Sequence, residues 1–298
     1  MTSKLEVVSS NKTHSGRITK FKFQSSSLGD LVTSINVFVP LSTEPSKKFP
    51  VLFYLAGLTC NEDTGPQKGG FLAEAAKHGI ALVFPDTSPR GADVEGEGDD
   101  WDFGTGAGFY LNATHPKWAK HYQMEKLITE EIPNVLGASD LPLELTRKSI
   151  FGHSMGGHGA LTLYLNHPTL YKSCSAFAPI ANPTNCAWGK KAFNGPNGND
   201  GYLAKGLEEG RKYDATELIK HAKPSQVKIL IDYGSSDQFY KDGQLLPENF
   251  IDAFSQIKNL KDAEINVRKQ DDYDHSYYFV STFATDHLEF HAKYLKSM

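Results

Sequence analysis

Short segments rich in apolar residues recur along the chain, and their patterns are of two kinds. Residues 50–55 and 80–85 are continuously apolar, which is typical of strands buried on both faces of a sheet. Residues 17–23 and 32–39 instead alternate between apolar and polar side chains, as strands of an antiparallel edge do. The pattern therefore predicts a sheet with a covered centre and an antiparallel first part.

The rest of the chain alternates predicted strands with predicted helices. Further strands are expected at 149–151, 173–178, 227–233 and 263–267. Helices are expected at 70–78, 123–135 with an interruption at Pro133, 157–165, 247–258 and 285–295. This alternation predicts an α/β protein with a mostly parallel central sheet flanked by helices. Since the sequence shows no repeat, low-complexity segment or linker, we expect a single domain over residues 1–298.

A serine flanked by glycines stands between one predicted strand and the helix that follows. The segment is Gly152-His153-Ser154-Met155-Gly156, and the order strand, Gly-x-Ser-x-Gly, helix is typical of a nucleophile elbow. Such a turn exposes the serine hydroxyl, and the chain passes so close to itself that only glycine is tolerated at positions 152 and 156. The alternative is a glycine-rich turn that merely opens a helix, so the serine needs partners downstream.

Those partners are expected beyond the carboxyl ends of later strands, in the order acid and then histidine. Asp237 lies in the loop after strand 227–233, and His275 is the only histidine in the loop after strand 263–267. A histidine accepts the proton of the serine and a buried carboxylate orients it, so the trio predicts a serine hydrolase. Asp232, still inside its strand, and Asp274, beside His275, are the weaker candidates for the acid.

Two backbone N–H groups are expected to stabilise the oxyanion that forms on attack. One belongs to Met155, the residue after the nucleophile, and the other to Leu58, in the loop after strand 50–55. Gly57 lets that loop turn back toward the serine. On these residues alone, an ordinary strand-ending turn is the alternative interpretation of 56–60.

Composition limits the partners that this chain is expected to have. Its 298 residues carry a formal net charge of −4, which gives no reason to expect nucleic acid or an anionic membrane as a partner. No segment is apolar enough to span a bilayer, and the first residues lack a signal core. Three cysteines, Cys60, Cys174 and Cys186, argue against a disulfide framework and favour a cytoplasmic protein. Neither metal-ligand spacing nor a phosphate-binding glycine loop occurs, so no metal and no cofactor is expected.

Five longer segments resemble one known family. They read Leu-Ala-Gly-Leu-Thr-Cys at 55–60, Phe-Pro-Asp-Thr-Ser-Pro-Arg-Gly at 84–91, Trp-Asp-Phe-Gly-Thr-Gly-Ala-Gly-Phe-Tyr at 101–110, Gly-His-Ser-Met-Gly-Gly at 152–157 and Asp-His-Ser-Tyr-Tyr-Phe at 274–279. Together they look like the S-formylglutathione hydrolase, or esterase D, family over nearly the whole chain. The resemblance implies an α/β-hydrolase fold and a cytosolic serine thioesterase without a metal, commonly a homodimer, that acts in glutathione-dependent formaldehyde detoxification. It implies a triad of Ser154, Asp237 and His275, with the N–H groups of Leu58 and Met155 as oxyanion donors.

The chain also departs from the pattern of that family. Ala56 stands where the family usually has Ser, and His158 stands where it often has Tyr. Residues 194–201 form a longer and more glycine-rich segment than the family pattern has, which bears on a loop near the substrate. The basic candidates for binding the glutathione carboxylates are Arg90, Lys190 and Lys191.

Other side chains are candidates for the neighbourhood of the reacting groups. A formyl group is the smallest acyl group, so a tight acyl side is expected, and its candidate wall is formed by Trp101, Phe103 and Trp188. Ordinary loop packing is the alternative for these aromatic residues. Cys60 is either a small buried apolar side chain or, as the resemblance favours, a thiol close to Ser154.

Two other functions stay open on the sequence. A general carboxylesterase for short acyl esters needs the same triad, and the relative turnover of the two substrates separates the alternatives. A binding protein on a hydrolase fold that has lost its chemistry belongs to a different class, because fold alone does not fix function. The intact set of serine, acid and histidine argues against an inactive protein.

Overall fold

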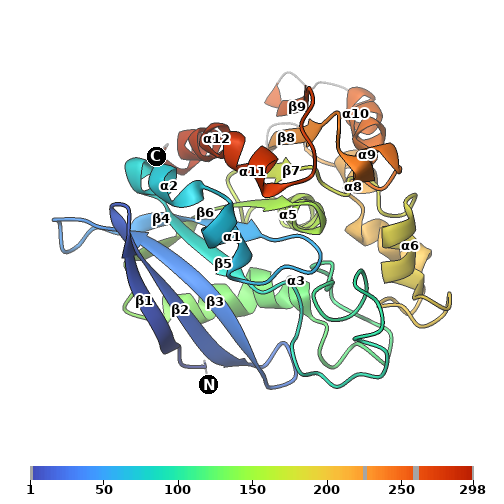
Figure 1. Cartoon of the computed structure of the whole chain (residues 1–298), viewed down its shortest axis with the longest axis horizontal. Helices are drawn as coiled ribbons and strands as arrows, with labels where there is room; N and C mark the ends of the chain where they lie inside the picture. Colours follow the sequence, from blue (N-terminus) through green and yellow to red (C-terminus); the bar gives the residue numbers. More distant parts are fainter. Residues whose placement is uncertain (1–2, 224–226, 258–261, 297–298) are drawn as a thin grey trace.

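The computed structural model describes residues 3–223, 227–257 and 262–296 (Figure 1). Its centre is a nine-stranded sheet with the strand order β1-β2-β3-β5-β4-β6-β7-β8-β9. The strands are β1 (Glu6–Thr13), β2 (Gly16–Ser25), β3 (Leu31–Pro40), β4 (Phe49–Leu55), β5 (Ala81–Pro85), β6 (Leu143–His153), β7 (Cys174–Phe177), β8 (Lys228–Gly234) and β9 (Glu264–Gln270). The helices are α1 (Thr64–Lys68), α2 (Phe71–His78), α3 (Met124–Lys126), η1 (Leu127–Glu131), α4 (Ile132–Gly137), α5 (Met155–Asn166), α6 (Ala187–Asn194), α7 (Leu207–Gly210), η2 (Arg211–Tyr213), α8 (Ala215–Ile219), α9 (Gln238–Lys241), α10 (Pro247–Ser255), α11 (Tyr277–Thr282) and α12 (Ala284–Lys296).

The sheet is parallel from β5 to β9 and antiparallel at its beginning. β4 pairs in parallel with β5 and β6, and the parallel pairing continues through β7 and β8 to β9. β1, β2 and β3 pair antiparallel with one another, and β3 pairs antiparallel with β5. The predicted α/β-hydrolase architecture, with a mostly parallel central sheet, is therefore confirmed.

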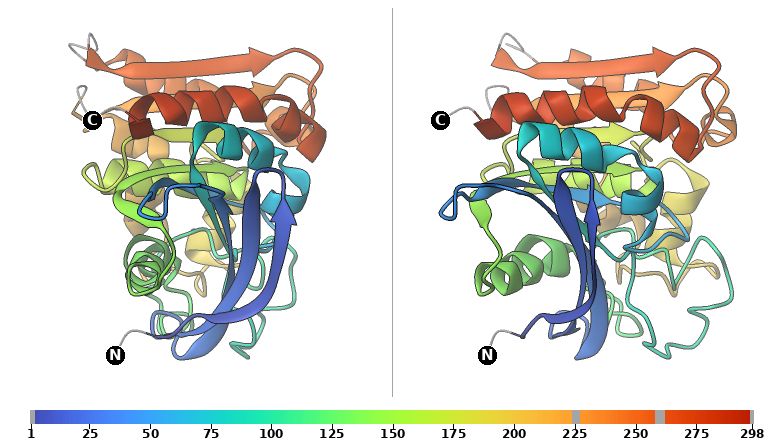
Figure 2. Two further views of the ribbon diagram at one scale, coloured as in Figure 1. Left: turned by 90° about the vertical axis from the view of Figure 1, so that its left-hand side faces the viewer. Right: turned by 60° about the vertical axis from the view of Figure 1, so that its left-hand side comes forward.

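Helices cover both faces of the sheet, as parallel strands require. α2 and α12 lie side by side on one face, and α4 packs against β6 on the other face (Figure 2). β4 and β5 are buried along their whole length, which explains their continuous apolar sequence. Each fully buried Val, Leu or Phe contributes about 1.5–3 kcal/mol of hydrophobic stabilisation.

Several predicted boundaries differ from the structure, and the strand expected at 149–151 is the longer β6, Leu143–His153. The helix expected at 123–135 is a succession of α3, the π-helical turn η1 and α4, with Pro133 in the first turn of α4. A proline has no N–H to donate to the preceding turn, and the chain widens there. The helix expected at 247–258 ends at Ser255, and residue 258 lies outside the described residues.

None of the helices in the described part of the chain has both the length and the apolar character needed to cross a membrane.

Candidate active site

Ser154 occupies a sharp turn between β6 and α5. Its backbone has φ 59° and ψ −119°, in a region that residues other than glycine rarely adopt. A β-carbon on Gly152 would lie 2.2 Å from the carbonyl oxygen of Gly156, and one on Gly156 would lie 2.0 Å from that of Leu55. The two glycines are therefore required by close backbone approach, as the elbow interpretation predicts.

Hydrogen bonds hold the strained turn in place. The N–H of Ser154 donates to the carbonyl oxygen of Phe177 at 2.9 Å, and its carbonyl oxygen accepts from the N–H of His158 at 2.9 Å. β7 and the first turn of α5 thus fix Ser154 from both sides. This arrangement presents the side chain at the carboxyl end of the sheet, where sites of parallel α/β proteins lie.

Asp237 and His275 form a hydrogen-bonded pair. Nδ1 of His275 lies 2.5 Å from Oδ2 of Asp237, and the carboxylate is completely buried. The other oxygen, Oδ1, accepts from the N–H groups of Phe239 at 2.8 Å and Tyr240 at 3.3 Å, so Asp237 caps α9. With both oxygens bonded, the carboxylate has a fixed orientation toward the imidazole.

His153 links this pair to the serine elbow. Its ring centroid lies 4.5 Å from that of His275, and its backbone is bonded directly to Ser154. Burial and the neighbouring His275 hold the pKa of His153 well below its usual range, so this ring is neutral beside the imidazole. The structure thus brings Asp237, His275 and the elbow together from the ends of β8, β9 and β6.

The two weaker candidates for the acid are placed elsewhere. Asp232 is buried inside β8 and accepts hydrogen bonds from Nε of Arg268 at 2.7 Å, from Gln270 at 2.8 Å and from His287 at 2.9 Å. Asp274 is exposed and accepts from the N–H and hydroxyl of Ser276. Neither has a hydrogen bond to His275 within the residues that the structure describes.

The loop after β4 passes directly against the elbow. A β-carbon on Gly57 would lie 3.1 Å from the β-carbon of Ser154 and 3.3 Å from the carbonyl oxygen of His153. The N–H of Thr59 donates to Gly106 at 2.9 Å and so fixes the far side of the loop. Over the described ranges, the N–H of Leu58 donates to no protein acceptor, which leaves it available to a ligand.

Aromatic rings extend from His275 to the surface. The ring of Phe239 lies 4.7 Å from His275, and Trp188 lies 4.7 Å from Phe239. Trp101 then contacts Trp188 edge-on at 5.7 Å and is 55% exposed. Trp101 and Trp188 were expected from the sequence, whereas Phe239 was missed, and its only sequence signal is its position two residues after Asp237.

Phe103 lies in a different aromatic cluster. It stacks on Tyr202 at 4.6 Å and meets Trp118 edge-on at 5.1 Å, and its own side chain is buried. The glycine-rich segment 194–201 packs against the same cluster, because Nε1 of Trp118 donates to the carbonyl oxygen of Asp200 at 2.6 Å. These contacts indicate a role in holding the loops together.

Cys60 lies in the loop after β4. Burial raises the pKa of its thiol, although the hydroxyls of Thr64 and Tyr277 act in the opposite direction. The ring of Tyr277 in turn lies 5.4 Å from His153, and its hydroxyl is 2.9 Å from that of Tyr54. The thiol is thus linked to the elbow through Tyr277, and it is protonated at neutral pH.

The basic candidates for binding substrate carboxylates differ in whether they already form ion pairs within the protein. Arg90 holds Asp86 through Nε at 3.0 Å and Nη2 at 2.7 Å. Lys191 pairs with Asp102 at 2.5 Å, whereas the neighbouring Lys190 is exposed. Arg90 and Lys191 would have to exchange an internal partner for a substrate carboxylate.

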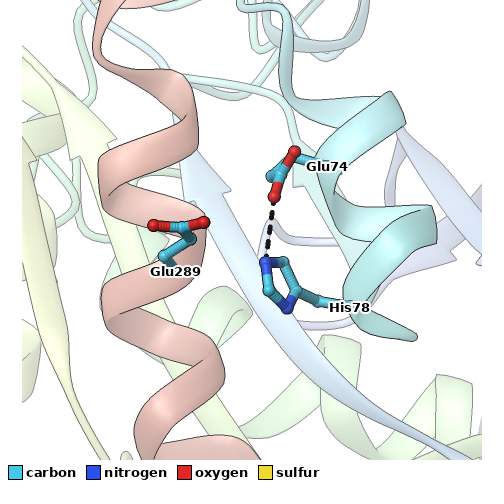
Figure 3. A group of neighbouring side chains, drawn as sticks. All are labelled: Glu74, His78 and Glu289. Atoms are coloured by element: carbon cyan, nitrogen blue, oxygen red, sulfur yellow. Dashed lines mark ion pairs between the residues drawn. The ribbon is translucent and has the colours of Figure 1, made fainter.

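One group of side chains has the composition of a metal site. Glu74 and His78 on α2 and Glu289 on α12 point toward one another (Figure 3), with ligand atoms within 4.8 Å. Lys77 lies 2.7 Å from Glu74, and Lys296 donates to Nδ1 of His78 at 3.0 Å. Because Nδ1 accepts that hydrogen bond, the neutral ring carries its proton on Nε2, which faces Glu74 at 2.9 Å. The nitrogen that a metal would need is protonated, so we interpret the group as a polar cluster in which Lys77, at 3.9 Å from Glu289, joins α2 to α12.

Comparisons with known proteins agree with this geometry. The model of the family described as putative esterase matches residues 25–290. The curated S-formylglutathione hydrolase of Mus musculus is 47% identical to this chain, and the match covers 98% of this chain and 99% of the mouse protein. The curated S-formylglutathione hydrolase of Arabidopsis thaliana is also 47% identical, and that match covers 99% of this chain and 100% of the plant protein. A solved S-formylglutathione hydrolase from Agrobacterium tumefaciens is 41% identical with a TM-score of 0.88, covering 97% of this chain and 99% of its own. A fluorophosphonate-binding serine hydrolase of Staphylococcus aureus shares only the fold, at 18% identity and a TM-score of 0.68 over 93% of this chain and 98% of its own.

Proposed function

This chain belongs to the S-formylglutathione hydrolases within the putative esterase family, and from that premise we propose that it hydrolyses S-formylglutathione to formate and glutathione. The observation that carries the proposal is the hydrogen bond between the buried Asp237 and His275, whose ring contacts the residue before Ser154. An acid and a histidine beside a serine on a strained turn are the parts that acyl transfer requires.

In the first half of the reaction, the hydroxyl oxygen of Ser154 attacks the formyl carbonyl carbon. Nε2 of His275 accepts the serine proton as the C–O bond forms, and Asp237 stabilises the resulting imidazolium through Nδ1. The N–H groups of Leu58 and Met155 bind the oxyanion. When the tetrahedral intermediate collapses, the C–S bond breaks, and glutathione leaves as the thiol after His275 returns the proton.

In the second half, water replaces the thiol. His275 removes a proton from the water as its oxygen attacks the formyl-serine carbonyl, and the same N–H groups bind the second oxyanion. Collapse breaks the bond to Ser154, which recovers its proton from His275, and formate is released. Each proton in the cycle passes through Nε2 of His275, so the orientation of the His275 ring governs both halves of the reaction.

The proposed substrate-binding surface begins at the aromatic rings beside His275. Trp101 and Trp188 form the outer part of a wall that begins at His275, and we assign them to the side on which the thioester binds. Lys190 is exposed, and it is our first candidate for contact with a glutathione carboxylate. The same proposal includes Cys60 as a near-site thiol whose modification blocks Ser154.

At the level of the whole protein, we propose a single α/β-hydrolase domain over residues 1–298 that works in the cytoplasm as a homodimer. Its role there is glutathione-dependent formaldehyde detoxification. The steps above use only side chains and backbone groups of this chain, so the proposal calls for no metal and no cofactor.

The decisive experiment compares two substrates. We would measure kcat/KM for S-formylglutathione and for p-nitrophenyl acetate, with the Ser154→Ala variant as the blank. A preference of about a hundredfold or more, roughly 2.7 kcal/mol in the transition state, supports the proposed function. A ratio near one favours a general carboxylesterase, and failure of Ser154 to react with a fluorophosphonate label would indicate a protein without hydrolase chemistry.

A further inference from the structure

Phe239 contacts both the acid and the histidine of the proposed triad. Its N–H donates to Oδ1 of Asp237 at 2.8 Å, and its ring lies 4.7 Å from the His275 ring at an interplanar angle of 88°. One residue thus touches Asp237 through its backbone and His275 through its side chain. No motif in the sequence singles this residue out.

His275 needs more than its hydrogen bond to stay in position. It lies in the loop between β9 and α11, and 17% of its side chain is exposed. The bond from Nδ1 to Asp237 fixes one atom of the imidazole but allows the ring to rotate about the axis of that bond. Contacts with the rings of His153 at 4.5 Å and Phe239 at 4.7 Å restrict the rotation, because a rotated imidazole would collide with them.

We propose that Phe239 is a positioning residue for His275, an inference that rests on the serine-hydrolase mechanism proposed above. Its N–H holds the Asp237 carboxylate, and its ring holds the plane of the imidazole, so that Nε2 faces Ser154 in both halves of the reaction. Phe239 is only partly buried, lies on the four-residue helix α9 and packs against the edge of the core. Its ring contacts are with His275 and Trp188, which both belong to the site.

Tyr240 provides a matched control on the same helix. Its N–H also donates to Oδ1 of Asp237, at 3.3 Å, but its ring packs on Tyr233 at 5.1 Å. Replacing Phe239 or Tyr240 by alanine therefore removes an aromatic ring from α9 and keeps the backbone N–H that caps it. Only the Phe239 variant removes a ring contact with His275.

The experiment measures kcat and KM of the full-length Phe239→Ala, Phe239→Tyr and Tyr240→Ala proteins. We use S-formylglutathione and p-nitrophenyl acetate as separate substrates. Phe239→Ala should lower kcat about ten- to a hundredfold, with KM changed by less than about threefold, because a misplaced base slows chemistry without weakening binding. Phe239→Tyr, which keeps the ring, should restore most of the rate, and Tyr240→Ala should stay within about threefold of the unaltered protein.

A spectroscopic readout separates positioning from simple packing. The Nδ1 proton shared with Asp237 should give a far-downfield proton NMR signal in the unaltered, Phe239→Tyr and Tyr240→Ala proteins. In Phe239→Ala the signal should broaden or disappear, while the thermal unfolding midpoint stays close to that of Tyr240→Ala. If the Phe239→Ala protein does not fold, Phe239→Leu, which keeps an apolar side chain without a ring, takes its place.

Several results would overturn the proposal. They are an unchanged kcat in Phe239→Ala, an equal loss in Tyr240→Ala, or a raised KM with unchanged kcat, which would make Phe239 a substrate contact. If the unaltered protein hydrolyses p-nitrophenyl acetate but not S-formylglutathione, the proposed substrate fails. The role of Phe239 is still decided by the ester kinetics and the NMR signal.

Discussion

Gly156 lies so close to Leu55 that a β-carbon on the glycine would be 2.0 Å from the carbonyl oxygen of the leucine. The same β-carbon would lie 2.6 Å from the carbonyl oxygen of Ala56. The first turn of α5 is thereby packed onto the end of β4, from which the loop with Gly57 and Leu58 begins. The nucleophile and the proposed oxyanion donor are held at a fixed distance because the two backbones touch.

Gly156→Ala should therefore damage the site and the fold together. The new methyl group meets backbone rather than a flexible side chain, so β4 or α5 must shift, at a cost of about 3 kcal/mol. We expect activity to fall by two orders of magnitude or more, since about 1 Å of misplacement costs roughly a hundredfold. Gly98→Ala is the control, because its β-carbon would meet nothing within 4 Å, and its stability should change by less than about 0.5 kcal/mol. Urea unfolding and ester turnover of both variants check this prediction.

The acid of the triad can be tested against its neighbour in sequence. In Asp237→Asn an amide replaces the carboxylate that accepts from Nδ1 of His275, which favours the wrong tautomer and removes the stabilisation of the imidazolium. We expect kcat to fall by about three to four orders of magnitude. Asp274→Asn changes an exposed carboxylate whose hydrogen bonds within the described residues are to Ser276, and it should leave kcat within about threefold. A large loss in Asp274→Asn, or a small one in Asp237→Asn, would reverse the assignment.

The elements that the sequence predicted best are those whose pattern is imposed locally. β4 and β5 are buried on both faces and so read as unbroken apolar runs, and the elbow needs glycine at 152 and 156 for reasons of backbone geometry. β1 was not predicted, because nearly all of its side chains are exposed and no alternation marks it. It is a strand only because β2 pairs with it.

In the site, too, some features follow from local sequence and others from contacts between distant segments. The position of Asp237 in the loop, with Asp232 still inside its strand, favoured Asp237, and the structure adds a reason: Asp232 already bonds to Arg268, Gln270 and His287. The contact between Phe239 and His275 could not be predicted, since it joins residues 36 positions apart through loop conformations that no motif encodes. For Phe103 the sequence left two interpretations open, a wall of the acyl side and ordinary loop packing, and in the structure its ring packs on Tyr202.

Beneath the strands that end at the site, a buried chain of hydrogen bonds suggests a test of stability. Oγ of Ser175 lies 2.8 Å from Nδ1 of His287 and 2.8 Å from Nε2 of His291, and all three side chains are fully buried. Ser175→Ala leaves two ring nitrogens unpaired, so unfolding free energy should drop by about 2 kcal/mol or more. Ser10→Ala, which removes an exposed hydroxyl, should change it by less than about 0.5 kcal/mol. Equal urea midpoints for the two variants would contradict this account.

The pH dependence of stability should begin near pH 6.5 and reflect buried neutral histidines. Burial lowers the pKa of His158 to about 4, although its hydrogen bond to the carbonyl oxygen of Phe109 acts in the opposite direction. Below pH 6.5 the unfolded chain binds a proton at this residue that the folded chain does not bind. The stability contributed by neutral His158 is therefore fully present above pH 6.5 and lost as the pH falls toward 4, by about 3 kcal/mol in total.

His158→Phe isolates this contribution, because the other histidines titrate in both proteins and their effects cancel in the difference. At pH 8 the variant should be the less stable protein, by about 1 kcal/mol for the lost hydrogen bond to Phe109. Between pH 6.5 and 4 the unaltered protein loses stability more steeply, since only its residue 158 can bind a proton on unfolding. The two stability curves should converge and cross within that window when urea unfolding is followed at several pH values. Parallel curves over the whole range would mean that His158 does not titrate on unfolding, and would place the acid sensitivity at the other buried histidines.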